Sequence, residues 1–212
     1  MFQIIHEDDH LIVVNKASGF LSVPGRGPEK IDSVAHRVRQ RRPDAITHPA
    51  VHRLDMDTSG LLVLAYTAEA HRHLSRQFQE RQTQKTYHSL LDGTLPPEKG
   101  THGRIELPFR LDIDNRPYQI HDPIHGKIGL THWRLLANEP PHARIEFTPH
   151  TGRTHQLRVH AAHPLGLGLP IVGDPLYGNG SAPGQLKLHA TTLSFTHPHT
   201  LETLTFTTPV PF

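Results

Sequence analysis

One segment of the chain places two ionisable side chains inside a stretch that is otherwise apolar. Arg53 and Asp55 precede the turn-forming sequence Thr58-Ser59-Gly60, and residues 61–65 form a continuous apolar run of strand length. We predict two apolar strands broken by a tight turn, with Asp55 where a buried strand emerges into a loop. Catalytic groups are common at such positions on a rigid scaffold. An isolated Arg-x-Asp pair would more simply be a structural ion pair at a sheet edge.

The longer string around these residues favours a specific chemistry. His-Arg-Leu-Asp-x-x-Thr-Ser-Gly-Leu-Leu, residues 52–62, resembles the signature of the RluA family of RNA pseudouridine synthases. Four further segments resemble family motifs in the family order, although Ala17 stands where the family usually has proline: residues 9–19, 85–87, 151–160 and 171–178. The resemblance spans about residues 6–190.

The resemblance implies an isomerase that breaks the C1′–N1 bond of a uridine in RNA, turns the base and joins C1′ to C5. No redox change or added group is involved, so we expect no cofactor. Asp55 would be the ionised catalytic carboxylate, and Tyr87 would stack on the flipped uracil and take part in proton transfer. Arg158 would be the cation that opposes the rise in the pKa of Asp55 caused by burial. The alternatives are core packing for Tyr87 and a phosphate contact for Arg158.

Five residues are expected to contact RNA. Arg53 is the candidate wedge, because a planar guanidinium can enter the base stack where the target base was; its alternative role is support of the Asp55 loop. The other four RNA-binding candidates lie in the motifs at residues 52–62 and 151–160: His52, Arg153, His155 and Gln156.

The composition agrees with one soluble catalytic domain. A chain of 212 residues with 35% hydrophobic and 20% charged residues is long enough for one well-buried core. We expect residues 1–212 to form a single catalytic domain without the amino-terminal S4 RNA-binding domain that many relatives carry. The absence of cysteine excludes thiolate catalysis and Cys-based zinc sites. An acidic start and the lack of a long apolar run favour a cytoplasmic protein that does not enter the membrane.

Charge gives weaker information about partners. The net charge is only +2, but the sequence pI is about 9.0 and four arginines lie within residues 37–42. This arginine cluster is compatible with an RNA-binding surface and equally with an ordinary solvent-exposed surface. The 20 histidines are scattered and include no H-E-x-x-H motif, so we expect no metal site and mostly surface histidines.

The spacing of apolar residues predicts an α+β fold. We expect helices over about residues 31–40, 67–81 and 156–163, with Asp32 and Thr67 capping the first two. Residues 4–14 are expected to form a strand, a turn at residues 7–10 and a second strand at residues 11–14. Further strands are expected near residues 87–91, 103–107, 128–136, 143–148 and 201–206, and a surface loop over residues 178–184. This pattern favours a mainly antiparallel sheet flanked by a few helices. The family resemblance adds that the sheet bends around a catalytic cleft.

The resulting hypothesis is an RNA pseudouridine synthase acting on structured stem-loops: the tRNA anticodon loop, a 23S rRNA hairpin, or both. Three alternatives stay open, namely a paralogue for another tRNA or rRNA uridine, a non-catalytic RNA-binding or RNA-folding module, and a metal-dependent hydrolase. We expect a monomer without an obligatory protein partner.

Overall fold

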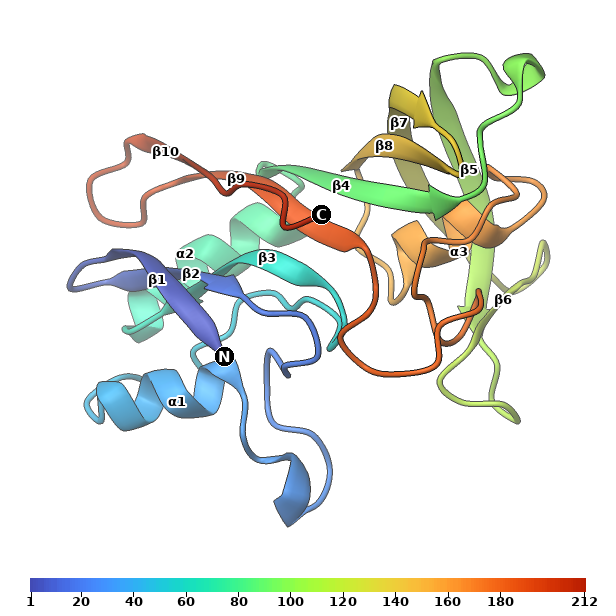
Figure 1. Cartoon of the computed structure of the whole chain (residues 1–212). Helices are drawn as coiled ribbons and strands as arrows, with labels where there is room; N and C mark the ends of the chain where they lie inside the picture. Colours follow the sequence, from blue (N-terminus) through green and yellow to red (C-terminus); the bar gives the residue numbers. More distant parts are fainter. The chain divides into compact units, whose positions relative to one another are not determined.

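The structure is a computed structural model that describes all 212 residues, in two compact units (Figure 1). Unit 1 comprises Met1–Lys85 and His189–Pro211, and unit 2 comprises Thr86–Leu188 and Phe212. None of the helices is both long and apolar enough to cross a membrane.

Unit 1 is built on five strands. Their order is β1-β2-β3-β9-β10, and every pairing is antiparallel except the short parallel contact between β3 and β9. The strands are β1 (Phe2–Glu7), β2 (Leu11–Lys16), β3 (Ser59–Ala65), β9 (Leu188–Thr196) and β10 (Thr203–Thr207). Gly60 is required where β3 meets β9, because a Cβ atom there would lie 2.3 Å from the carbonyl oxygen of Ala190.

The centre of unit 1 is buried on both faces of β3. All seven residues of β3 are buried, as expected for a continuous apolar run. α2 (Ala68–Gln79) covers one face with the four-residue spacing predicted from the sequence: Ala70 and Leu74 are buried and Phe78 packs beside them (Figure 1). Thr67 caps this helix by accepting a hydrogen bond from the backbone N–H of Ala70, as predicted.

The first helix begins later than predicted. α1 (Val34–Arg41) is capped by Ser33, whose hydroxyl accepts from the N–H of His36, so the prediction of Asp32 as the cap was wrong. Asp32 instead binds Arg37 through both carboxylate oxygens. The neighbouring arginines are also paired within the protein, Arg41 with Glu7 and Arg42 with Asp9 and Asp44. Arg41 and Arg42 thus link the end of α1 to residues at and after the end of β1.

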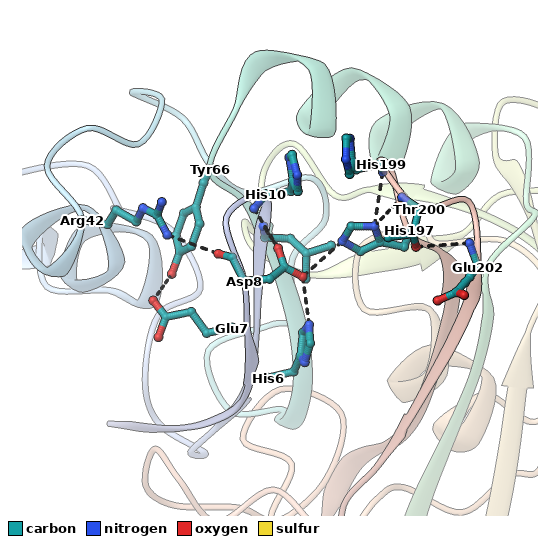
Figure 2. A network of polar contacts seen from close by, with 11 residues as sticks. His6, Glu7, Asp8, His10, Arg42, Tyr66, His197, His199, Thr200 and Glu202 are labelled. Carbon is teal, nitrogen blue, oxygen red and sulfur yellow. Dashed lines mark hydrogen bonds and ion pairs between the residues drawn. The ribbon is translucent and has the colours of Figure 1, made fainter.

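A single carboxylate joins the two hairpin turns of unit 1 (Figure 2). Asp8, in the turn between β1 and β2, accepts hydrogen bonds from His6 Nε2 at 2.9 Å and from His197 Nε2 at 3.1 Å. His197 lies between β9 and β10, and its Nδ1 accepts two backbone N–H groups of that turn. The side chain of Asp8 therefore tethers the carboxyl-terminal hairpin to the amino-terminal one.

Unit 2 is an antiparallel sheet with one helix. The strand order is β4-β8-β7-β5-β6, and α3 contacts β7. The elements are β4 (Gln84–Asp92), which begins in unit 1, β5 (His102–Leu111), β6 (Gln119–His121), β7 (Lys127–Glu139), β8 (His142–Pro149) and α3 (Gln156–Ala162). Two short 3-10 helices complete the fold, η1 (Pro28–Lys30) in unit 1 and η2 (Pro97–Lys99) in unit 2.

The fold class is the predicted α+β with a mainly antiparallel sheet, but some elements were missed. The strands β6 and β9 were not predicted; β9 alternates threonine and serine with apolar residues, so its apolar signal is diluted. Residues 51–54 do not form a strand, and the turn lies at residues 55–58, where the N–H of Thr58 donates to the carbonyl of Asp55. Asp55 therefore precedes the buried strand β3 instead of following a strand.

Three of the 20 histidines are buried, His160, His189 and His197, whereas the others are exposed or half-buried. His160 is 0% exposed, and neither of its ring nitrogens has a hydrogen-bond partner. Its ring meets the edge of Phe109, and a Cβ atom on Gly129 would come within 2.9 Å of its Nε2. Burial, with a smaller effect from His163, lowers the pKa of His160 to about 4. His160 is thus neutral in the folded protein at neutral pH.

We expect His160 to contribute to acid instability. Above pH 6.5 the imidazole is neutral in both the folded and the unfolded state. Between pH 6.5 and about 4 only the unfolded chain takes up the proton, so the free energy of unfolding decreases as the pH is lowered. The protein with His160→Leu should lose about 2 kcal/mol less than wild type between pH 7 and pH 4.5, measured by urea unfolding. The control is His125→Leu, since the side chain of His125 is 74% exposed; equal losses in all three proteins would contradict this origin.

Candidate active site

The loop that carries Asp55 is fixed by residues from the beginning of the chain. The hydroxyl of Ser22 donates to the carbonyl of Leu54 at 2.7 Å and accepts the N–H of the same residue at 3.1 Å. The hydroxyl of Ser18 donates to the carbonyl of Asp57. Asp55 itself is half-buried between these attachments. The loop therefore has a defined backbone on both sides of the carboxylate.

A buried lysine completes this support. Lys16 is 0% exposed, and its Nζ donates to three carbonyl oxygens, those of Ala17 at 3.0 Å, Phe20 at 2.7 Å and Met56 at 2.8 Å. Burial lowers the pKa of Lys16 to about 7, while the charges of Asp57 and Asp55 oppose that shift. Three acceptors match the three N–H groups that only the protonated amine offers. Lys16 belongs to the opening motif, but the sequence alone assigned it no role.

The two motif residues before Asp55 differ in their surroundings. His52 accepts the backbone N–H of Val63 through Nε2, at 3.2 Å, and its ring stacks on Phe78 at 4.2 Å between centroids. Burial and the charge of Lys85 lower the pKa of His52 to about 3. Arg53 is exposed. These contacts give His52 a structural role in holding the segment against β3 and α2, and leave the Arg53 side chain at the surface.

In unit 2, Arg158 is held by Asp174. The guanidinium donates from Nε to Asp174 Oδ2 at 2.8 Å and from Nη2 to Oδ1 at 2.6 Å, and the two side chains are 3% and 0% exposed. The backbone N–H groups of Leu176 and Tyr177 also donate to Oδ1. Burial raises the pKa of Asp174, but Arg158 and these N–H groups outweigh it and lower the pKa overall. Asp174 was not among the predicted site residues, although it lies in the closing Gly-Asp-Pro-Leu-Tyr motif.

The segment before α3 is also tightly organised. Gln156 is buried, accepts from the hydroxyl of Thr151 and the N–H of Arg153, and donates to the Leu130 carbonyl and to Thr131 Oγ1. The amide oxygen and the amide nitrogen of Gln156 thus each form two hydrogen bonds within the protein. His155 adopts a left-handed backbone conformation, with φ of 55°, which turns the chain into the helix.

Tyr177 connects His155 with Arg158. Its hydroxyl lies 2.9 Å from His155 Nδ1 and accepts the N–H of Gln119 at 2.8 Å. Its ring centroid is 5.3 Å from the guanidinium carbon of Arg158, within the range of a cation–π contact.

The remaining candidates lie at the surface or in the sheet. Arg153 is exposed, and Tyr87 is half-buried in β4, opposite Phe147 of β8, where it packs against the core of unit 2. Asp55, Arg53 and His52 belong to unit 1, whereas Tyr87 and the four candidates of the 151–160 motif belong to unit 2.

No group of three or more histidine and carboxylate side chains is arranged to hold a metal ion.

Replacing Lys16 tests the support of the Asp55 loop. We expect Lys16→Met to lower the free energy of unfolding by about 2–4 kcal/mol, because methionine has a similar length but leaves three buried carbonyl oxygens without their donor. Urea unfolding measures the loss, and Lys30→Met, at an exposed position, serves as the control. Equal stability of the two variants would show that the ammonium is not needed for the loop.

Comparison with known proteins identifies the family. Residues 10–163 match the family model described as RNA pseudouridylate synthase. The proteins named Dual-specificity RNA pseudouridine synthase RluA are 44% identical over 212 residues in Haemophilus ducreyi, covering 98% of this chain and 93% of that protein, and 43% identical over 213 residues in Escherichia coli K12, covering 99% and 93%. The Haemophilus influenzae protein of the same name is 45% identical over 207 residues, covering 96% and 90%.

Solved structures agree with this assignment. Human RNA Pseudouridylate Synthase Domain Containing 1 superposes with a TM-score of 0.77 at 29% identity, covering 100% of this chain and 84% of that one. Human RNA Pseudouridylate Synthase Domain Containing 4 shares the fold, with a TM-score of 0.75 at 24% identity and coverage of 98% and 88%. The chain belongs to the RluA family of RNA pseudouridine synthases, and it is an isomerase.

Proposed function

We propose that this pseudouridine synthase is dual-specific and modifies one uridine in the tRNA anticodon loop and one in a 23S rRNA hairpin. The observation that carries this proposal is the near full-length similarity, at 43–45% identity, to relatives named as dual-specificity enzymes. The segment Leu21-Ser22-Val23-Pro24-Gly25-Arg26 also resembles these enzymes more narrowly than the rest of the family. An unpaired loop is the cheapest place to extract a base, since pairing is already absent there.

We propose Asp55 as the catalytic carboxylate. Attack on C1′, addition to the uracil ring and abstraction of the C2′ proton all need an anion beside the sugar. The geometry of the loop supports this role, because Ser22, Ser18 and Lys16 hold the backbone around a half-buried carboxylate. A catalytic group on such a fixed loop needs no rearrangement when the substrate binds.

Arg158 is the proposed cation that keeps Asp55 ionised. Asp174 takes two of the five N–H groups of its guanidinium and fixes its plane, so the other three point in defined directions. Tyr87 is proposed to stack on the flipped uracil. Arg53 is the proposed wedge, which its exposed side chain permits, and Arg153 is a proposed phosphate contact. His52, His155 and Gln156 would act by holding these residues in place.

We further propose that the enzyme works in the cytoplasm as a monomer and without a cofactor. The isomerisation is redox-neutral and adds no group, so the charge of Asp55 and Arg158 suffices for the chemistry proposed here.

The first functional test replaces the carboxylate. Asp55→Asn should abolish tritium release from C5-labelled uridine in both a tRNA and a 23S rRNA transcript, because the isosteric amide cannot act as an anion. RNA affinity should stay within about threefold, since phosphate contacts elsewhere dominate binding. Asp44→Asn, at a side chain that is 75% exposed, is the matched control and should retain full turnover. Multiple turnover by Asp55→Asn would refute the assignment, and wild-type activity on only one RNA class would refute dual specificity.

The second test separates a wedge from a general RNA contact. Arg53→Ala should slow modification of a folded hairpin about tenfold more than modification of an RNA whose target base is already unstacked, because only the hairpin requires the base to be displaced. Arg153→Ala, another exposed arginine, should slow both reactions equally if it binds phosphate. Single-turnover rates on the two RNAs provide the comparison, and equal losses for Arg53→Ala would exclude the wedge role.

A further inference from the structure

A cavity of about 540 Å³ lies within unit 2, between β6 and the carboxyl-terminal half of α3. This volume falls in the range of small-molecule sites, roughly 300–1,000 Å³. The residues that line it include His121, His163 and Tyr177 and the apolar residues Ile120, Val159 and Ala162. None of the residues proposed for catalysis lines it.

The lining combines three ring-bearing side chains with apolar residues and one amide, that of Gln119. The centroids of His121 and His163 are 5.0 Å apart, and burial together with the neighbouring His121 lowers the pKa of His163, which keeps its ring neutral at neutral pH. No lysine, arginine, aspartate or glutamate lines the cavity. Phosphate sites are built from arginine and lysine, so a phosphate is a poor match. Unpaired nucleobases are bound by aromatic side chains, histidine included, with a few hydrogen-bonding groups.

Tyr177 connects this cavity to the Arg158 site. Tyr177 lines the cavity, and its ring centroid lies 5.3 Å from the guanidinium carbon of Arg158. Its hydroxyl is fixed by the N–H of Gln119, a residue that also lines the cavity, and by His155. A ligand in the cavity would therefore lie one side chain away from the proposed catalytic cation.

We infer that the cavity binds a second unpaired nucleobase of the RNA substrate, from a loop position near the target uridine. The inference rests on the proposed function, because it places Arg158 at the catalytic centre. Extraction of the target base leaves its loop neighbours without stacking partners, and capture of one of them would offset part of that cost. The site would then select RNA loops by the arrangement of two extruded bases.

Filling the cavity provides the test. Ala162 is half-buried in the wall, so Ala162→Phe should occupy the space of the base, whereas Leu165→Phe, at a side chain that is 67% exposed and outside the cavity, is the matched control. The probes are the anticodon stem-loop and the 23S rRNA hairpin, each also made with a single abasic nucleotide at every loop position. Fluorescence anisotropy gives the Kd of each RNA.

With wild type, one abasic position besides the target should raise the Kd about tenfold, as expected for one stacked base. Ala162→Phe should raise the Kd of the intact hairpin by a similar factor. For the RNA that is abasic at that position, Ala162→Phe should cause no further rise in Kd. For RNAs that are abasic at other positions, the effects of the variant and of the missing base on the free energy of binding should add. Leu165→Phe should bind like wild type. His121→Ala, which enlarges the site, should show the same non-additive pattern and replaces Ala162→Phe if thermal unfolding shows that variant to be misfolded.

Additive losses at every loop position, or unchanged binding by both cavity variants, would overturn the inference. These experiments measure binding and not turnover. The cavity inference can therefore be wrong while the inactivity of Asp55→Asn supports the catalytic assignment, or correct while an active Asp55→Asn refutes it. The failure of the cavity inference is thereby distinguishable from the failure of the catalytic assignment.

Discussion

The conformation of the Asp55 loop depends on the hydrogen bonds that the buried ammonium group of Lys16 donates to backbone carbonyls. A charge that is 0% exposed would be too costly to bury alone, and three carbonyl oxygens satisfy its three N–H groups. One of these carbonyls belongs to Met56, directly after Asp55, while the other two belong to the segment after β2. The charge thus joins the end of a buried strand to the loop and gives the proposed catalytic carboxylate a fixed backbone in unit 1.

Unit 2 fixes its own charged group by the same means. Arg158 and Asp174 are both buried, and the carboxylate receives two backbone N–H groups in addition to the guanidinium. A buried pair tolerates little change, because removing one partner leaves the other charged and unpaired. In both units, then, a polar group in the low-dielectric interior sets the direction of a side chain or the path of a loop, and the strands supply the rigid frame.

The distribution of charge separates structural from RNA-binding roles. Three of the four arginines within residues 37–42, namely Arg37, Arg41 and Arg42, form ion pairs with carboxylates of the same protein. Contacts within the protein therefore account for part of this dense cluster. Arg53 and Arg153 are single residues in the motifs, yet they are exposed and suited to RNA. Four histidines are also explained by packing or internal hydrogen bonds: His52, His160, His189 and His197. Local density of a residue type is therefore a poor guide to function here.

The sequence by itself determined the family, the α+β class, the capping of α2 by Thr67 and the motifs that contain the candidate residues, because these depend on local spacing and on long ordered strings. Only the tertiary structure decided which motif residues are exposed and which support others. Lys16 supports the Asp55 loop through the carbonyl of Met56, 40 residues away, and Asp174 holds Arg158, 16 residues away, so no local pattern reveals these roles. The strand β9 was missed because its threonines and serine dilute its apolar signal. Its threonines Thr192 and Thr196 pair with the neighbouring β10, whereas His189 and Ala190 pair with β3, which is distant in the chain.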